Sequence, residues 1–160
     1  MPKTNGSLAA IALLVGACTP PSPVTDRITS VTLTRTDCAA NCPDYTVHIN
    51  RAGQVAFIGR KNVTYASAQW KVGERNTQMI MEKVEQADIS EADVSKTNRS
   101  GCPRFPDVSG FDIIVEAPKG NTQYEMNTCL TVKGQAQMTA LAAFIDKLTN
   151  TSKAIVATTP

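Results

Sequence analysis

The sequence lacks an excess of charge of either sign and has no run of basic residues. Its 16 lysines and arginines stand against 14 aspartates and glutamates, which gives a formal net charge of +2. Such a near-neutral chain has no electrostatic footprint for nucleic acid or for a strongly anionic surface. The composition therefore predicts no nucleic-acid partner.

The motifs of several enzyme classes are also missing. No glycine-rich phosphate-binding motif occurs, and no Gly-x-Ser-x-Gly motif accompanies His48, the single histidine. The acidic residues are scattered along the chain. We therefore assign no catalytic residue, expect no cofactor, and favour a protein that is not an enzyme.

Long apolar runs are absent after Cys18, but a short one precedes it. Residues 7–17 are uncharged and mostly apolar, and Lys3 is the lone charge before them. This run is too short to span a bilayer and suits the hydrophobic region of a signal peptide. Gly16 and Ala17 then precede Cys18, and "VGAC" resembles the lipobox of bacterial lipoproteins, in which the cysteine is lipidated and becomes the mature N-terminus.

The N-terminal features predict a lipoprotein signal peptide over residues 1–17 and lipidation of Cys18. Residues 18–27 include the segment TPPSPVT, which would serve as an extended tether. The membrane is then one partner, and the protein is expected in the bacterial cell envelope, at the outer membrane facing the periplasm. An ordinary cleaved signal peptide followed by a chance cysteine is the alternative.

Two-residue alternation predicts strands in the first half of the chain. It occurs in residues 31–35, 44–50 and 54–59, and a turn with Gly53 joins the last two segments. A hairpin over this turn places Ile49 opposite Val55 and Val47 opposite Phe57, so that apolar faces match. Residues 62–72 are expected to add one or two further strand pieces.

Helical periodicity predicts two amphipathic helices later in the chain, one from residue 74 and one over residues 135–148. Between them lie a long polar loop (residues 90–110) and a second hairpin. A two-residue turn at Lys119 and Gly120 would pair Val115 with Tyr124 and Ile113 with Met126.

The order strands, helix, hairpin, helix predicts an α+β domain over residues 28–149, followed by a flexible tail over residues 150–160. We expect a mainly antiparallel sheet with both helices packed on its apolar face. The other face is expected to meet water with Ser30, Thr32, Thr34, Thr46, His48 and Asn50.

Apart from Cys18, four cysteines remain, and an even number in an exported protein indicates two disulfides with three possible connectivities. We expect Cys38 to pair with Cys42, and Cys102 with Cys129, because the predicted second hairpin brings the loop close to Cys129. Pairing of Cys38 with Cys102 and of Cys42 with Cys129 is the competing arrangement.

Cys38 and Cys42 admit two other interpretations. A redox pair is usually spaced Cys-x-x-Cys at a helix start, whereas this pair is spaced Cys-x-x-x-Cys between two strands and is followed by Pro43. A zinc site could combine the four cysteines, or His48 in place of one, but an oxidising envelope disfavours free thiolates. A structural disulfide is the favoured interpretation, and no metal is expected.

The stretch TRTDCAANCPDYTVHINRAGQVAFIG resembles a bacterial family of small exported proteins known as a domain of unknown function. The shared pattern is Thr-Arg-Thr-x-Cys-x-x-x-Cys-Pro-x-Tyr, and the likeness in pattern covers most of the chain after Cys18. The resemblance implies an envelope location and an α+β domain, and it carries no catalytic residue. The matching positions are Thr34, Arg35, Thr36, Cys38, Cys42, Pro43 and Tyr45.

Two functions from different classes follow. The first is a non-enzymatic binding or structural module of the envelope whose partner is an unknown envelope protein or cell-wall component. The second is a thiol–disulfide redox protein that uses Cys38 and Cys42.

Overall fold

The computed structural model describes residues 27–36, 38, 41–87 and 110–155. Six strands form one sheet in the order β4-β3-β2-β1-β5-β6, and every neighbouring pair is antiparallel. Among the described residues two α-helices complete the fold, so the α+β class is confirmed. The elements are β1 (Ser30–Arg35), β2 (Asp44–Asn50), β3 (Gln54–Lys61), β4 (Ser67–Lys71), α1 (Glu74–Glu85), β5 (Phe111–Ala117), β6 (Gly120–Glu125), α2 (Val132–Thr149) and the short 3-10 helix η4 (Thr151–Ala154).

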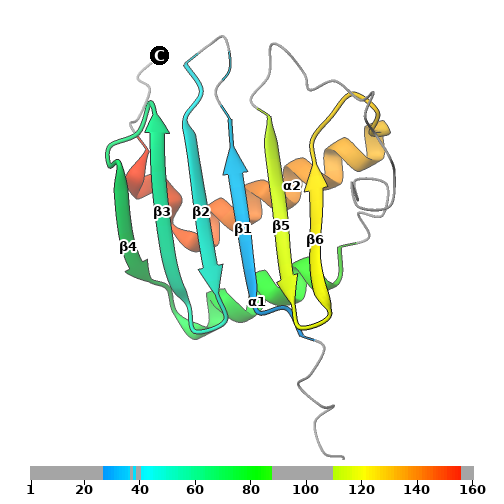
Figure 1. Ribbon diagram of the computed structural model, residues 1–160, viewed down its shortest axis with the longest axis horizontal. Coiled ribbons are helices and arrows are strands. Elements are labelled where there is room, and N and C mark those ends of the chain that lie inside the picture. The colour runs from blue at the N-terminus through cyan, green and yellow to red at the C-terminus, as the bar shows by residue number, and fades with distance from the viewer. Residues whose placement is uncertain (1–26, 37, 39–40, 88–109, 156–160) are drawn as a thin grey trace, which may run out of the picture.

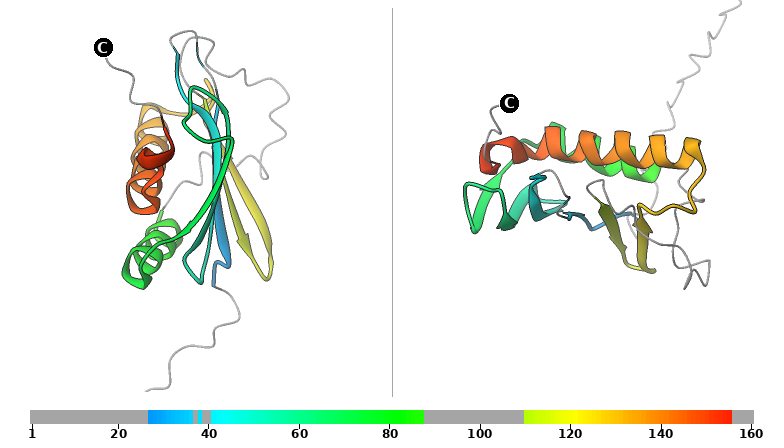
Figure 2. Two further views of the ribbon diagram at one scale, coloured as in Figure 1. Left: turned by 90° about the vertical axis from the view of Figure 1, so that its left-hand side faces the viewer. Right: turned by 90° about the horizontal axis from the view of Figure 1, so that it is seen from above.

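The molecule has two layers. Figure 1 looks onto the sheet with α1 and α2 behind it, and the side view in Figure 2 places both helices on the same side of the strands. In the part of the chain that the structure describes, neither helix is long and apolar enough to cross a membrane.

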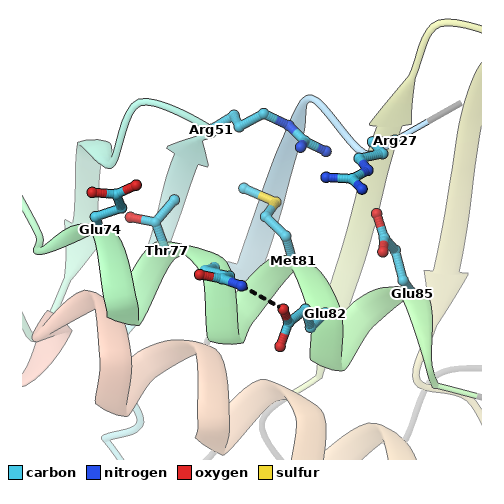
Figure 3. A pocket seen from close by; sticks show the side chains of 8 residues that line it. Arg27, Arg51, Glu74, Thr77, Met81, Glu82 and Glu85 are labelled. Atoms are coloured by element: carbon cyan, nitrogen blue, oxygen red, sulfur yellow. Dashed lines mark hydrogen bonds between the residues drawn. The ribbon is translucent and has the colours of Figure 1, made fainter. Parts of the chain in front are cut away.

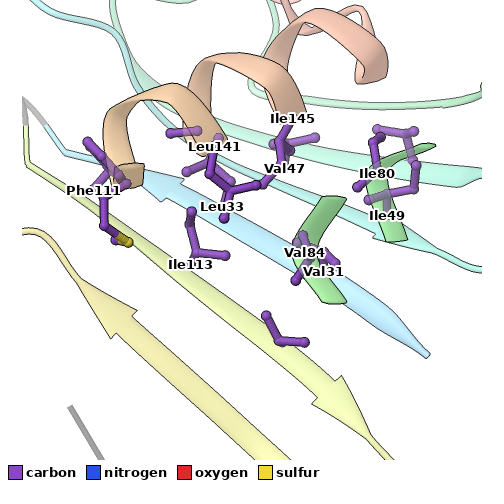
Figure 4. Packing of buried hydrophobic residues seen from close by; sticks show 14 of the residues in the cluster. Val31, Leu33, Val47, Ile49, Ile80, Val84, Phe111, Ile113, Leu141 and Ile145 are labelled. Atoms are coloured by element: carbon purple, nitrogen blue, oxygen red, sulfur yellow. The ribbon is translucent and has the colours of Figure 1, made fainter. Parts of the chain in front are cut away.

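The core fills the space between the sheet and the helices (Figure 4). Alternate residues of the central strands point into it, as the burial of β2 at every second position shows. Each such aliphatic side chain contributes about 1.5–3 kcal/mol when it leaves water. Fully buried members include Val31, Leu33, Val47, Ile49, Ile80, Ile113, Met138, Leu141 and Ile145.

The β2–β3 hairpin has the predicted register, with Val47 opposite Phe57 and Ile49 opposite Val55. Gly53 adopts a positive φ of 76°, and a Cβ there would lie 2.7 Å from the carbonyl oxygen of Val72. Both restrictions exclude other residues, because only glycine combines the left-handed conformation with so close an approach.

The predicted register of the β5–β6 hairpin is wrong by two residues. Val115 pairs with Thr122, and the turn is Pro118-Lys119, between the paired residues Ala117 and Gly120. This register puts proline at the second turn position and glycine at the fourth, where each is favoured. A two-residue shift leaves every side chain on its original face, so the apolar pattern could not reveal the error.

Helix α2 begins three residues before the predicted start. The hydroxyl of Thr131 accepts a hydrogen bond from the Gly134 amide at 3.1 Å and caps the helix. The packed part of the chain also extends beyond the expected boundary at residue 149. Thr151 and Ala154 of η4 are buried, and Ile155 forms a bridge with Val63.

Candidate functional site

The family motif lies where β1 and β2 meet the second helix. Arg35, the last residue of β1, stands directly opposite Tyr45 near the start of β2. Both continue the inward-facing series of their strands, so their side chains reach towards α2. There they meet Asp146, and we call Arg35, Tyr45 and Asp146 the motif cluster.

Arg35 binds Asp146 through two guanidinium nitrogens. Its Nε donates to Oδ2 of Asp146 at 2.8 Å, and Nη2 lies 2.7 Å from the same oxygen. The guanidinium carbon also lies 5.4 Å from the centre of the Phe111 ring, a cation–π distance. Burial lowers the pKa of Arg35, but the charge and hydrogen bond of Asp146, together with Tyr45, outweigh burial and raise the pKa on balance, so the ion pair keeps its charge.

Tyr45 satisfies the other oxygen of the same carboxylate. Its hydroxyl donates to Oδ1 of Asp146 at 2.7 Å, while its ring stacks on Phe57 with centroids 5.3 Å apart. Burial raises the pKa of the Tyr45 phenol, and the negative charge of Asp146 raises it further. Tyr45 therefore stays a neutral donor, and Asp146 accepts from two different strands at once.

A disulfide closes the connection between Arg35 and Tyr45. Cys38 and Cys42 are bonded, with Cα atoms 5.3 Å apart, and the Cys42 amide donates to the sulfur of Cys38 at 3.3 Å. The side chain of Asn62 donates to the Cys42 carbonyl at 3.0 Å, which ties this loop to the end of β3. The expected Cys38–Cys42 disulfide is thus present as a local staple.

The two motif threonines also serve structural contacts. The hydroxyls of Thr34 and Thr46 lie 3.1 Å apart across β1 and β2. Thr36 donates from both its amide and its hydroxyl to the Gly110 carbonyl, at 2.9 and 3.1 Å. The motif therefore links β1, β2, the start of β5 and α2 at one end of the sheet.

The remaining cysteines are placed only in part. Cys129 is disulfide-bonded, whereas Cys102 and Cys18 lie outside the described residues. The pairing of Cys102 with Cys129 and the lipidation of Cys18 stay predictions.

The face of the sheet opposite the helices is less open to water than we expected. His48 is half-buried, and its Nδ1 lies 3.0 Å from the Thr32 hydroxyl. Ser30 is buried and its hydroxyl donates to the Glu116 carboxylate. Cross-strand hydrogen bonds between polar side chains thus cover part of this face.

The residues that the structure describes include no ligand set for a metal ion. No group of three or more histidine, cysteine, aspartate or glutamate side chains there could hold an ion. Cys38 and Cys42 offer no thiolates because they are bonded to each other.

Sequence reasoning missed Asp146, the residue on which the motif cluster converges. Its partners lie 111 and 101 positions away in the chain, so no local pattern joins them. The one available signal was an acidic residue directly after Ile145, on a helix with few other charges.

The two layers define a small α+β domain. At one end of it, the motif residues form a disulfide and an ion pair that link the strands to α2. The chain belongs to the family described as Domain of unknown function (DUF6438), which matches residues 29–151. The expected family membership is confirmed, and the matched range includes the whole motif cluster. No curated protein matches the sequence.

Proposed function

We propose that the protein is a lipid-anchored module of the bacterial cell envelope that binds or supports an envelope protein or cell-wall component and does not act as an enzyme. The anchor would be lipid on Cys18. The apolar run of residues 7–17 and the "VGAC" junction support this assignment.

The observation that carries the non-enzymatic role is that the motif is used for architecture. Asp146 accepts from Tyr45 at 2.7 Å and from Arg35 at 2.8 Å, so both oxygens of its carboxylate are engaged. These contacts fix α2 against the sheet and give the motif a structural purpose. A rigid end of this kind suits a domain that presents a surface to a partner.

The alternative is a thiol–disulfide redox protein built on Cys38 and Cys42. Reactive pairs of that type lie at a helix N-terminus, where the dipole lowers the thiol pKa. Here the disulfide joins β1 to β2, whereas the helices start at Glu74 and Val132. That placement favours a staple over a reactive pair.

Lipidation is tested by the substitution Cys18→Ala in the full chain. We expect the variant to lose incorporation of an alkyne-palmitate label and to leave the membrane fraction after cell disruption, because a lipid chain contributes about 0.8 kcal/mol for each buried CH₂. Thr25→Ala in the tether is the control and should label like the unaltered chain. Equal labelling of the Cys18→Ala variant would refute the anchor.

The redox alternative is tested by alkylation of the native protein followed by mass spectrometry, together with an insulin-reduction assay. We expect Cys38 and Cys42 to resist alkylation until a reductant is added, and insulin reduction to stay at the background rate. A thiol at either position that reacts at neutral pH, with catalysis above background, would favour the redox function instead.

A further inference from the structure

A cavity of about 470 Å³ opens at the end of the domain opposite the motif cluster. This end holds the start of β1 and the β2–β3 turn, since Ser30 is paired with Asn50, and the β5–β6 turn lies at the same edge (Figure 1). Helix α1 forms the other wall. The lining includes Arg27, Arg51, Glu74, Met81, Glu82 and Glu85.

Opposite charges face each other across this cavity. Figure 3 shows Arg27 and Arg51 entering from the side of the sheet, while Glu82 and Glu85 rise from α1, with Glu74 at its first turn. No ion pair between described residues joins any of these side chains. Two arginines and three glutamates that form no ion pair with a described residue therefore line one cavity.

The cationic wall is partly fixed in place. Nε and Nη2 of Arg51 donate to the Ile28 carbonyl at 2.9 and 2.5 Å, which holds the guanidinium at the rim. On the other wall Glu82 accepts from Gln78 at 2.7 Å. Met81 is buried between the two charged walls. Arg51 is thus held at the edge of the sheet, and the carboxylates stand on a helix whose other face is packed against the core.

The arrangement fits a ligand that carries both charges. Guanidinium groups bind phosphate oxygens through paired hydrogen bonds, and a primary ammonium group donates three hydrogen bonds, which carboxylates accept. A simple anion would meet the repulsion of three glutamates, and a simple cation that of two arginines. A phosphate joined to a primary amine satisfies both walls.

The position of the cavity indicates where such a ligand comes from. Arg27 follows Cys18 by nine positions, and an extended chain of that length spans at most about 30 Å. A lipid on Cys18 would therefore hold the cavity within reach of phospholipid headgroups. We infer that the cavity binds the phosphoethanolamine headgroup of a membrane phospholipid, an inference that rests on the proposed lipid anchor for its source of ligand.

The headgroup is tested without the membrane. The full-length Cys18→Ser chain, which cannot be lipidated, is titrated with glycerophosphoethanolamine and followed by amide chemical shifts. We expect saturable shifts that centre on Arg51 and α1, and binding about fivefold weaker or more for glycerophosphocholine, which lacks ammonium N–H donors. Glycerol phosphate, the anion alone, should be weaker in the same way. Equal affinity for the three compounds would overturn the inference.

Charge-neutral substitutions test the two walls separately. Arg27→Gln and Glu85→Gln should each weaken glycerophosphoethanolamine binding by about fivefold, and both replace exposed side chains without loss of packing. Arg75→Gln and Lys83→Gln remove exposed charges of α1 that lie outside the cavity, and they should leave binding unchanged. Binding that follows net charge rather than these positions would contradict the assignment.

Vesicles separate this inference from the anchor. The native protein, purified from membranes, is mixed with phosphatidylcholine vesicles that contain or lack phosphatidylethanolamine, and the amide shifts of α1 are compared. Perturbation of α1 only with phosphatidylethanolamine supports the headgroup site. If the soluble headgroup binds but Cys18 proves unmodified, the headgroup site is supported and the lipid anchor is refuted. If Cys18 is lipidated and neither experiment perturbs α1, the headgroup site is refuted and the anchor stands.

Discussion

The two ends of the sheet use the same residue types in opposite ways. At the motif end, Arg35 and Asp146 touch at 2.7 Å, and a tyrosine hydroxyl takes the second carboxylate oxygen. At the opposite end, which follows the predicted tether and which we call the tether end, Arg27 and Glu85 line the cavity and form no ion pair with each other. One set of charges is used to hold the domain together, whereas the other is available to a ligand.

The difference comes from what surrounds the charges. Arg35 extends from the inner face of β1 and its side chain is only 20% exposed, so it must be paired where it lies. Arg27 and Glu85 are exposed and water can solvate them. Removal of a charge should therefore destabilise the motif end strongly and the tether end hardly at all.

The largest effect is expected from Asp146→Ala. The change leaves the Arg35 guanidinium and the buried Tyr45 hydroxyl without their acceptor, and we expect a loss of about 2–3 kcal/mol in the free energy of unfolding. Urea denaturation measures it. Asp146→Asn is the matched control and should retain part of the stability through its remaining acceptor oxygen. An Asp146→Ala midpoint equal to that of the unaltered chain would abolish the contrast between the two ends.

Removal of the Cys38–Cys42 disulfide should have the next largest effect. The Cys38→Ala/Cys42→Ala double variant is expected to lose about 2 kcal/mol or less, because the closed loop is short and its chain entropy small. Combination with Asp146→Ala tests whether the staple acts through the motif cluster. We expect the two losses to be non-additive, since the loop holds Arg35 and Tyr45 together. Strict additivity would show that the disulfide acts alone.

Tyr45→Phe should cost about 1–2 kcal/mol at neutral pH. It keeps the ring that stacks on Phe57 and removes only the hydrogen bond to Asp146. Calorimetric or urea unfolding of both proteins at pH 7 gives the difference. Tyr65→Phe, at an exposed position, is the control and should change stability by less than about 0.5 kcal/mol.

The stability that Tyr45 contributes should disappear in alkali. Its pKa is raised on folding, so above about pH 10 the unfolded chain releases the phenolic proton while the folded chain keeps it. Proton release then favours unfolding, and the advantage of the native chain over Tyr45→Phe should fall by about 1.4 kcal/mol per pH unit. A constant difference between pH 7 and pH 11 would mean that Tyr45 titrates alike in both states.

The smallest effect is expected at the tether end. Glu85→Ala removes an exposed carboxylate that makes no ion pair with a described residue, and the free energy of unfolding should change by less than about 0.5 kcal/mol. A loss comparable to that of Asp146→Ala would show that the cavity charges also serve stability, which would weaken the comparison.

Local patterns determined much of the fold. The alternation of residues 44–50 and the turn at Gly53 were sufficient for the β2–β3 register, because the turn and the apolar faces agree on one pairing. The 3.6-residue period located α1, and the short spacing of Cys38 and Cys42 predicted the disulfide between them. These features depend on residues close together in the chain, so they can be inferred from sequence.

The tertiary structure alone decided the rest. The β5–β6 register differs by two residues from its alternative without moving a side chain to another face, so the apolar pattern does not distinguish the two pairings. The pairing of β1 with β5 joins segments between which β2, β3, β4 and α1 lie in the chain. Asp146 meets Arg35 across 111 positions, and Arg51 meets Glu82 and Glu85 at one cavity. The sequence by itself determined the elements and which faces are apolar, whereas the meeting of distant polar side chains depends on packing in three dimensions, because such contacts have no periodicity along the chain.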